Sequence, residues 1–187
     1  DSIRNRYDID GGAKITVDNG NMEVGNVRGK RQRVEDPQGR VGMSTTREYF
    51  SELSAPNGKI VAGDVRDTVK LDADTVITLN LIDNIKVTGK NILVYGTKVT
   101  YDVEFFLKKG GKIRFYDQGS GFDISDDSVV NLENGKKINI RDLKRDKLIS
   151  LGGKDITYDY IDDRENIKKS AKNNSGNKFG FGKIFHK

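Results

Sequence analysis

The chain has 187 residues, of which 34% are hydrophobic and 33% are charged, so it can build one domain with a core and barely two. It contains no cysteine and one histidine, His186, which excludes disulfides, thiolate nucleophiles, cysteine-bound zinc and histidine catalysis unless this terminal residue folds back. The net charge of +5 belongs to the tail 164–187, which carries seven Lys and Arg residues against one acidic residue, so the rest of the chain has no basic excess.

Residues 1–58 are expected to form an N-terminal arm outside the main domain. Within this arm, residues 14–17 and 22–24 flank an Asp-Asn-Gly turn and predict a small β-hairpin. Residues 44–53 can form a short helix, because Thr45 stands three positions before Glu48, which is the spacing of a capping box.

The arm also contains a basic run of four residues: Arg28, Lys30, Arg31 and Arg33. Such a run can bind the phosphates of a nucleic acid, so these residues form one candidate site. Acidic residues follow directly, at Glu35 and Asp36, and short basic runs are more often solvated loops whose charge is partly neutralised. We therefore favour a solvated loop here.

Residues 59–163 contain short strand candidates separated by glycine, aspartate and asparagine turns. The candidates are 60–62, 69–71, 75–82, 85–87 and 91–95. No helical period lies between them, so a parallel sheet with crossover helices is not expected, and we find no internal repeat at the spacing of a solenoid. The pattern predicts a mainly β domain, built as an antiparallel sandwich or a small barrel.

The centre of this domain is the stretch 97–116. Apolar and polar residues alternate along 99–107, which is typical of a strand buried on one face, and Lys108–Lys112 with its two glycines predicts a hairpin turn. The expected core consists of the apolar residues of this hairpin and of a preceding strand: Val99, Tyr101, Val103, Phe105, Ile113, Phe115, Ile77, Leu79 and Leu81.

Two further elements complete the predicted domain. Residues 141–151 are a helix candidate, because leucines share one face before a Gly-Gly stop. Residues 155–161 alternate again and predict an exposed edge strand. The predicted fold class is therefore mainly β, with one or two short helices and extended N- and C-terminal arms.

The tail 164–187 combines a polar, basic linker with an apolar end. Residues 164–177 have the composition of a linker, and residues 178–187 recover apolar character. The candidate partner-binding residues are Phe179, Phe181, Ile184 and Phe185. Under the nucleic-acid alternative, phosphates are bound by lysines of the same tail: Lys168, Lys169, Lys172, Lys178 and Lys183. A third interpretation is that the apolar residues dock on the core of their own chain.

The leading functional hypothesis is a non-enzymatic structural or assembly subunit of a larger particle, of the phage virion or secretion apparatus type. Its terminal arms would tie it to other protein subunits in a homo- or hetero-oligomer. The alternatives are a nucleic-acid-associated protein that uses the basic tail, and a small carboxylate-based enzyme or carbohydrate-binding β domain. We expect no catalytic residue, cofactor, metal site or membrane span, and a place in a virion or an extracytoplasmic assembly. Whether a leader or propeptide preceded Asp1 stays open.

Overall fold

The structure is a computed structural model that describes residues 3–4, 7–35, 44–116, 123–149 and 153–164. It is mainly β, with 58% of the described residues in strands and 9% in helices. The strands form a ten-stranded sheet, a five-stranded sheet and a two-stranded ribbon, and in the part of the chain described no sheet closes into a barrel.

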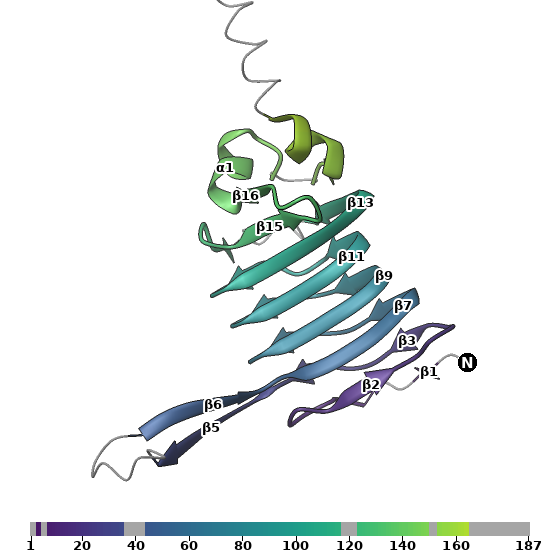
Figure 1. Cartoon of the computed structure of the whole chain (residues 1–187), viewed down its shortest axis with the longest axis vertical. Helices are drawn as coiled ribbons and strands as arrows, with labels where there is room; N and C mark the ends of the chain where they lie inside the picture. The colour runs from purple at the N-terminus through teal and green to yellow at the C-terminus, as the bar shows by residue number, and fades with distance from the viewer. Residues whose placement is uncertain (1–2, 5–6, 36–43, 117–122, 150–152, 165–187) are drawn as a thin grey trace, which may run out of the picture.

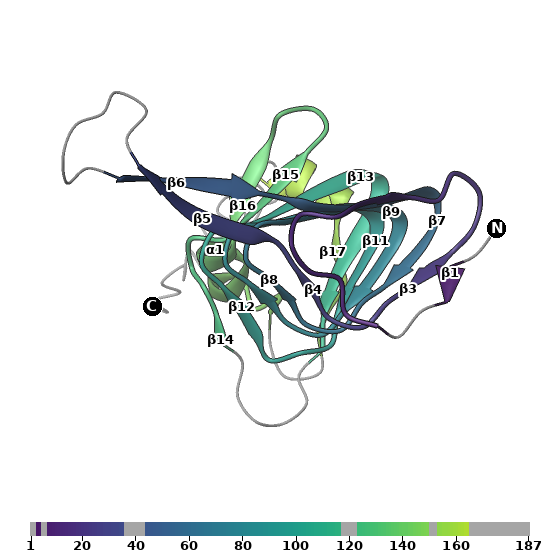
Figure 2. The same ribbon diagram turned by 90° about the horizontal axis from the view of Figure 1, so that it is seen from below.

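The chain winds into stacked coils, and the central coils each contribute one long strand to the larger sheet and one short strand to the opposite sheet (Figures 1 and 2). The long strands of the larger sheet are β7 (Ser51–Val61), β9 (Val69–Thr78), β11 (Ile85–Val94) and β13 (Val103–Phe115). The short strands of the opposite sheet are β4 (Val27–Arg28), β8 (Val65–Arg66), β10 (Leu81–Ile82), β12 (Lys98–Thr100) and β14 (Asp123–Ile124). All pairs among these strands are parallel, so the architecture is a parallel β-solenoid.

The predicted antiparallel pairing is therefore wrong for the body of the molecule. Parallel strands need a long connection, and here the strand of the opposite sheet supplies it in place of a helix. The prediction that no solenoid repeat exists is also wrong. Paired positions are 16 residues apart from Val69 to Ile85 but 18 from Ile85 to Val103, so the period is too irregular to stand out.

The N-terminal strands belong to the same solenoid. They are β1 (Ile3–Arg4), β2 (Lys14–Thr16) and β3 (Met22–Glu23). Both β2 and β3 pair in parallel with β7, so the hairpin predicted over 14–24 is wrong, and the Asp-Asn-Gly segment instead turns one corner of a coil. The predicted boundary between residues 58 and 59 falls inside β7.

The C-terminal end of the stack is covered by short elements (Figure 1). These are β15 (Val129–Leu132), β16 (Lys137–Asn139), α1 (Ile140–Arg145), β17 (Ile156–Thr157) and helical residues 158–164. The helix predicted at 141–151 is found but ends at Arg145. The predicted edge strand at 155–161 contains only β17, which pairs antiparallel with β13 before the chain turns helical.

The hairpin predicted at 97–116 is a single strand with a bulge. Leu107 of β13 pairs with Gly89 of β11, and Lys112 pairs with Asn91, so residues 108–111 bulge out where the coil turns a corner. A side chain at Gly111 would lie 2.4 Å from the carbonyl oxygen of Lys90, which is why the corner needs glycine. The two glycines therefore bend the strand and do not reverse it.

The core consists of columns of buried apolar side chains, one per coil and in register. One column runs through the first halves of the long strands: Leu53, Leu71, Val87, Phe105 and Val130. A second runs through the short strands: Val27, Val65, Leu81, Val99 and Ile124. A third runs through the second halves: Met22, Ile60, Val76, Ile92, Ile113 and Ile156. Burying each such side chain contributes about 1.5–3 kcal/mol.

Most of the predicted core is confirmed, including Val99, Val103, Phe105, Ile113, Phe115 and Leu81. Tyr101 and Leu79 were expected in the core but are 70% and 45% exposed, and Ile77 is half-buried on the outer face. The predictions for Tyr101 and Leu79 are wrong because both residues lie in corners between strands, where the alternation of faces is interrupted. The prediction for Ile77 is wrong for a different reason. Ile77 lies between Val76 and Thr78, whose side chains point inward.

One corner repeats as a two-residue turn in which both residues have positive φ. The turns are Asp67-Thr68, Asp83-Asn84 and Tyr101-Asp102, with φ between 53° and 71°. The first two turns donate backbone hydrogen bonds to the next coil. For example, Asp83 N donates to Thr100 O, just before the next turn, and Asn84 N donates to Tyr101 O within it. Asp and Asn tolerate this left-handed conformation better than most residues, which explains their frequency here.

A second corner is held by a ladder of polar side chains. Asp8 accepts hydrogen bonds from the backbone and side-chain nitrogens of Asn26, and Asn26 Oδ1 accepts from Asp64 N at 2.9 Å. Asn80 Nδ2 then donates to Asp64 Oδ1 at 2.8 Å, and Asn80 Oδ1 accepts from Lys98 N at 2.9 Å. The ladder satisfies backbone donors at corners where strand pairing is interrupted.

The register of the core predicts very different effects for two adjacent phenylalanines. Phe105 is fully buried in its column, whereas Phe106 is half-buried on the outer face. We expect Phe105→Ala to destabilise the fold by about 3–5 kcal/mol and Phe106→Ala by much less. Urea unfolding of both variants measures this, and equal losses would contradict the register.

The ladder predicts a pH-dependent contribution from Asp64. Burial alone would raise the pKa of Asp64, but hydrogen bonds from Arg66 and Asn80 outweigh it and hold the pKa below its ordinary value of 3.8. The ionised carboxylate therefore stabilises the fold above pH 3.8, and this contribution is lost as pH falls through the lower folded-state pKa.

Asp64→Asn keeps an acceptor for Asn80 but removes the ion pair with Arg66. We expect it to cost about 0.5–1 kcal/mol at pH 7 and progressively less below pH 3.8. Thermal unfolding at several pH values compares it with the wild type. A loss that does not change with pH would show that the charge of Asp64 is irrelevant.

Candidate functional site

Chemical sites are sparse in the described part of the chain. Its His, Cys, Asp and Glu residues form no group of three or more that could hold a metal ion. The acidic loop after β14 is neutralised by α1, because Asp126 lies 2.7 Å from Lys144 and 3.6 Å from Arg141. No helix among the described residues is long and apolar enough to cross a membrane.

The most conspicuous exposed element is an antiparallel ribbon of β5 (Lys30–Glu35) and β6 (Ser44–Tyr49). It projects from the side of the solenoid near the N-terminal coils (Figures 1 and 2). Every described residue of the two strands is exposed except Val34, which is half-buried. Both faces of the ribbon are therefore free of the chain's own core.

The ribbon is an insertion at the repeating two-residue turn. Val27 and Arg28 pair with Val65 and Arg66 of the next coil. Gly29 is therefore equivalent to Asp67, the first residue of the two-residue turn in that coil. Ser51 pairs with Val69, so the chain resumes its coil directly after Phe50. Where the next coil has two turn residues, this coil has Gly29, the ribbon and Phe50.

Sequence reasoning missed the ribbon. The basic run, predicted to be a solvated loop, lies in strands β4 and β5, and the helix predicted at 44–53 is instead strand β6 and the start of β7. A ribbon exposed on both faces has no alternation of apolar and polar residues, so the signal on which strand prediction depends is absent. The register Arg31–Glu48, with opposite charges on paired positions, was the available clue.

The base of the ribbon is fixed to the next coil by a charged cluster. Arg31 donates hydrogen bonds to both carboxylate oxygens of Asp83, at 2.6 and 3.0 Å, and its Nε lies 3.1 Å from Glu48. Asn84 completes the cluster by donating to Glu48 Oε2 at 2.7 Å. Burial opposes the charge of Arg31, but the bonds and charges of Asp83 and Glu48 outweigh it and raise its pKa.

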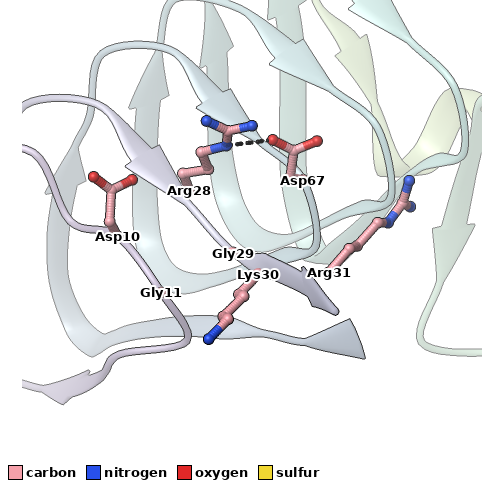
Figure 3. A pocket seen from close by; sticks show the side chains of 7 residues that line it. All are labelled: Asp10, Gly11, Arg28, Gly29, Lys30, Arg31 and Asp67. Atoms are coloured by element: carbon pink, nitrogen blue, oxygen red, sulfur yellow. Dashed lines mark hydrogen bonds and ion pairs between the residues drawn. The ribbon is translucent and has the colours of Figure 1, made fainter. Parts of the chain in front are cut away.

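A hollow of about 350 Å³ lies beside this base (Figure 3). It is lined by Asp10, Gly11, Arg28, Gly29, Lys30, Arg31 and Asp67. Arg28 Nε donates to Asp67 Oδ2 at 2.6 Å, and Lys30 points away from both arginines (Figure 3). The cations of the hollow therefore do not converge on one point where an anion would sit.

The structure separates the four residues of the basic run. Arg28 and Arg31 are engaged by carboxylates of the solenoid and the ribbon. Arg33 lies further along the ribbon and donates to Ser44 Oγ. The tail candidates, both the lysines and the apolar residues, lie outside the described residues: Lys168, Lys169, Lys172, Lys178, Lys183, Phe179, Phe181, Ile184 and Phe185.

The outer face of the solenoid is also neutralised by opposite charges in neighbouring coils. Glu52 lies 3.3 Å from Lys14 and 3.1 Å from Lys70, and Lys86 lies 3.5 Å from Glu104. These ion pairs follow the direction of the stack, because paired residues of successive coils point to the same side. As far as the structure describes it, this face offers no continuous basic track to a polyanion.

No protein-family model, no curated protein sequence and no solved structure matches the chain.

Proposed function

We propose that this chain is a non-enzymatic structural or assembly subunit of a larger particle, of the phage virion or secretion apparatus type. The observation that carries the proposal is the β5–β6 ribbon, whose two faces are both exposed. A two-stranded ribbon without a packed face is marginally stable in water, so a partner that covers one face would stabilise it. A second subunit is the partner that this function requires.

The solenoid body supports the same proposal. Its buried columns make a rigid scaffold in which each coil contacts only its neighbours, and such scaffolds hold projecting elements at fixed positions. The charged cluster of Arg31, Glu48 and Asp83 fixes the direction of the ribbon at its base. A rigid body with an anchored projecting arm suits attachment to a neighbouring subunit.

The nucleic-acid alternative has less support among the described residues. Arg28 and Arg31 are engaged by carboxylates, and the ion pairs between coils neutralise the outer face. A phosphate would have to displace a carboxylate that is already at hydrogen-bond distance. Binding of DNA or RNA that weakens steeply between two salt concentrations would favour this alternative over assembly.

The turn-insertion geometry allows the ribbon to be removed without disturbing the coil. A chain that lacks residues 30–49 and carries Phe50→Asn has two residues between Arg28 and Ser51, as the next coil has two between Arg66 and Val69. Asn is chosen because the second turn position requires positive φ. We expect this variant to lose the oligomeric mass of the full chain, measured by size-exclusion chromatography with light scattering.

The control for folding is thermal unfolding, which should show a cooperative transition for the shortened chain. A full chain that is a monodisperse monomer would contradict the assembly function. A shortened chain that folds and keeps the full oligomeric mass would show that the ribbon is not the contact.

A further inference from the structure

An apolar strip lies on the outer face of the first coils. Val61, Ile77 and Leu93 follow one another in register on the second halves of β7, β9 and β11, and all three are half-buried with their side chains outward. At the adjoining corner, Leu79 is 45% exposed. Exposed apolar strips on a protein with one third charged residues are typical of interaction surfaces.

Part of this strip is hollowed into a groove of about 480 Å³, here called the outer groove. Its lining includes Val61, Ile77, Leu79 and Tyr95, which are here called the apolar floor. Its charged lining residues are Asp8 and Glu23, here called the acidic rim, and no described lysine or arginine lines it. The outer groove therefore combines apolar with acidic lining residues.

These features match one segment of the same sequence. Residues 178–187 contain Phe179, Phe181, Ile184 and Phe185 together with three lysines, and they contain no acidic residue. Apolar side chains of such a segment would fill the floor, and its lysines would lie close to the acidic rim. Burial of one phenylalanine contributes more binding free energy than an exposed ion pair. We therefore expect the contacts with the apolar floor to contribute more to binding than those with the acidic rim.

The residue from which the tail continues and the outer groove lie at opposite ends of the solenoid. Arg164, the last described residue before the tail, is fixed to the C-terminal cap by ion pairs with Asp142 (3.2 Å) and Asp146 (2.8 Å). The outer groove lies on the first coils, which include β3, β7 and β9. When the binding segment starts from one end of a subunit and the groove lies at the other end, the contact between two subunits is heterologous and joins them head to tail.

We propose that residues 178–187 of one copy bind the outer groove of a neighbouring copy. This inference rests on the proposed assembly function and names the surface and the segment that meet. The linker 165–177 spans at most about 45 Å when extended, which is sufficient to bridge two adjacent subunits. The same reach also allows the segment to return to its own groove, so the experiment must separate the two cases.

The absence of cysteine from the chain permits a clean cross-linking test. Full-length chains with Leu79→Cys are mixed with full-length chains with Phe181→Cys under mild oxidation, and disulfide-linked dimers are followed on non-reducing gels. The matched control replaces Leu79→Cys by Tyr101→Cys, because Tyr101 is a more exposed corner residue outside the groove. We expect the dimer at Leu79→Cys to form about tenfold faster than at Tyr101→Cys, owing to the high local concentration of a docked segment.

Two results would overturn the inference. Equal rates of dimer formation with Leu79→Cys and with Tyr101→Cys would show that the segment does not bind the groove. A cross-link formed only within one chain that carries both Leu79→Cys and Phe181→Cys would show that it binds its own groove. If the full chain is oligomeric by light scattering but shows either result, only this inference fails; if it is a monomer, the assembly function fails as well.

Discussion

The structure depends on one constraint, which is that each coil must place an apolar side chain directly over that of the coil before it. Parallel pairing keeps equivalent residues in register, so the columns through Phe105, Leu81 and Ile92 continue from coil to coil. A shift of one strand by one residue would turn all buried side chains of that strand outward. Backbone hydrogen bonds and column packing therefore enforce the same register.

The corners have to preserve this register while the chain changes direction. They do so by three different means: bulges such as 108–111, two-residue turns with positive φ, and the polar ladder through Asn26, Asp64 and Asn80. Because the corners point away from the core, their length is free to vary. The ribbon is the largest such variation, since it replaces a turn while Gly29 and Ser51 remain paired with the next coil.

The distribution of charge has a direct consequence for function. A chain with 33% charged residues places many of them on the outer faces, where parallel stacking would bring like charges together. Opposite charges in neighbouring coils offset part of this repulsion: Lys14, Glu52 and Lys70 alternate in sign, and Lys86, which is paired with Lys70, lies 3.5 Å from Glu104. Among the described residues, the surfaces that remain distinctive are the ribbon and the outer groove.

The sequence by itself determined that the protein is mainly β, where most strands lie and which alternate residues are buried, because strand alternation is a local property of the chain. The faces of Val103 and Phe105 follow from that pattern. Only the tertiary structure decided how the strands pair. Alternation is the same in parallel and antiparallel sheets, and the Asn-Gly and Gly-Gly segments can either reverse a chain or turn the corner of a coil. The outer groove was likewise beyond the sequence, because it is lined by residues of separate coils that meet only when the solenoid is stacked. The ribbon was missed for another reason: it is exposed on both faces and therefore lacks the alternation on which strand prediction depends.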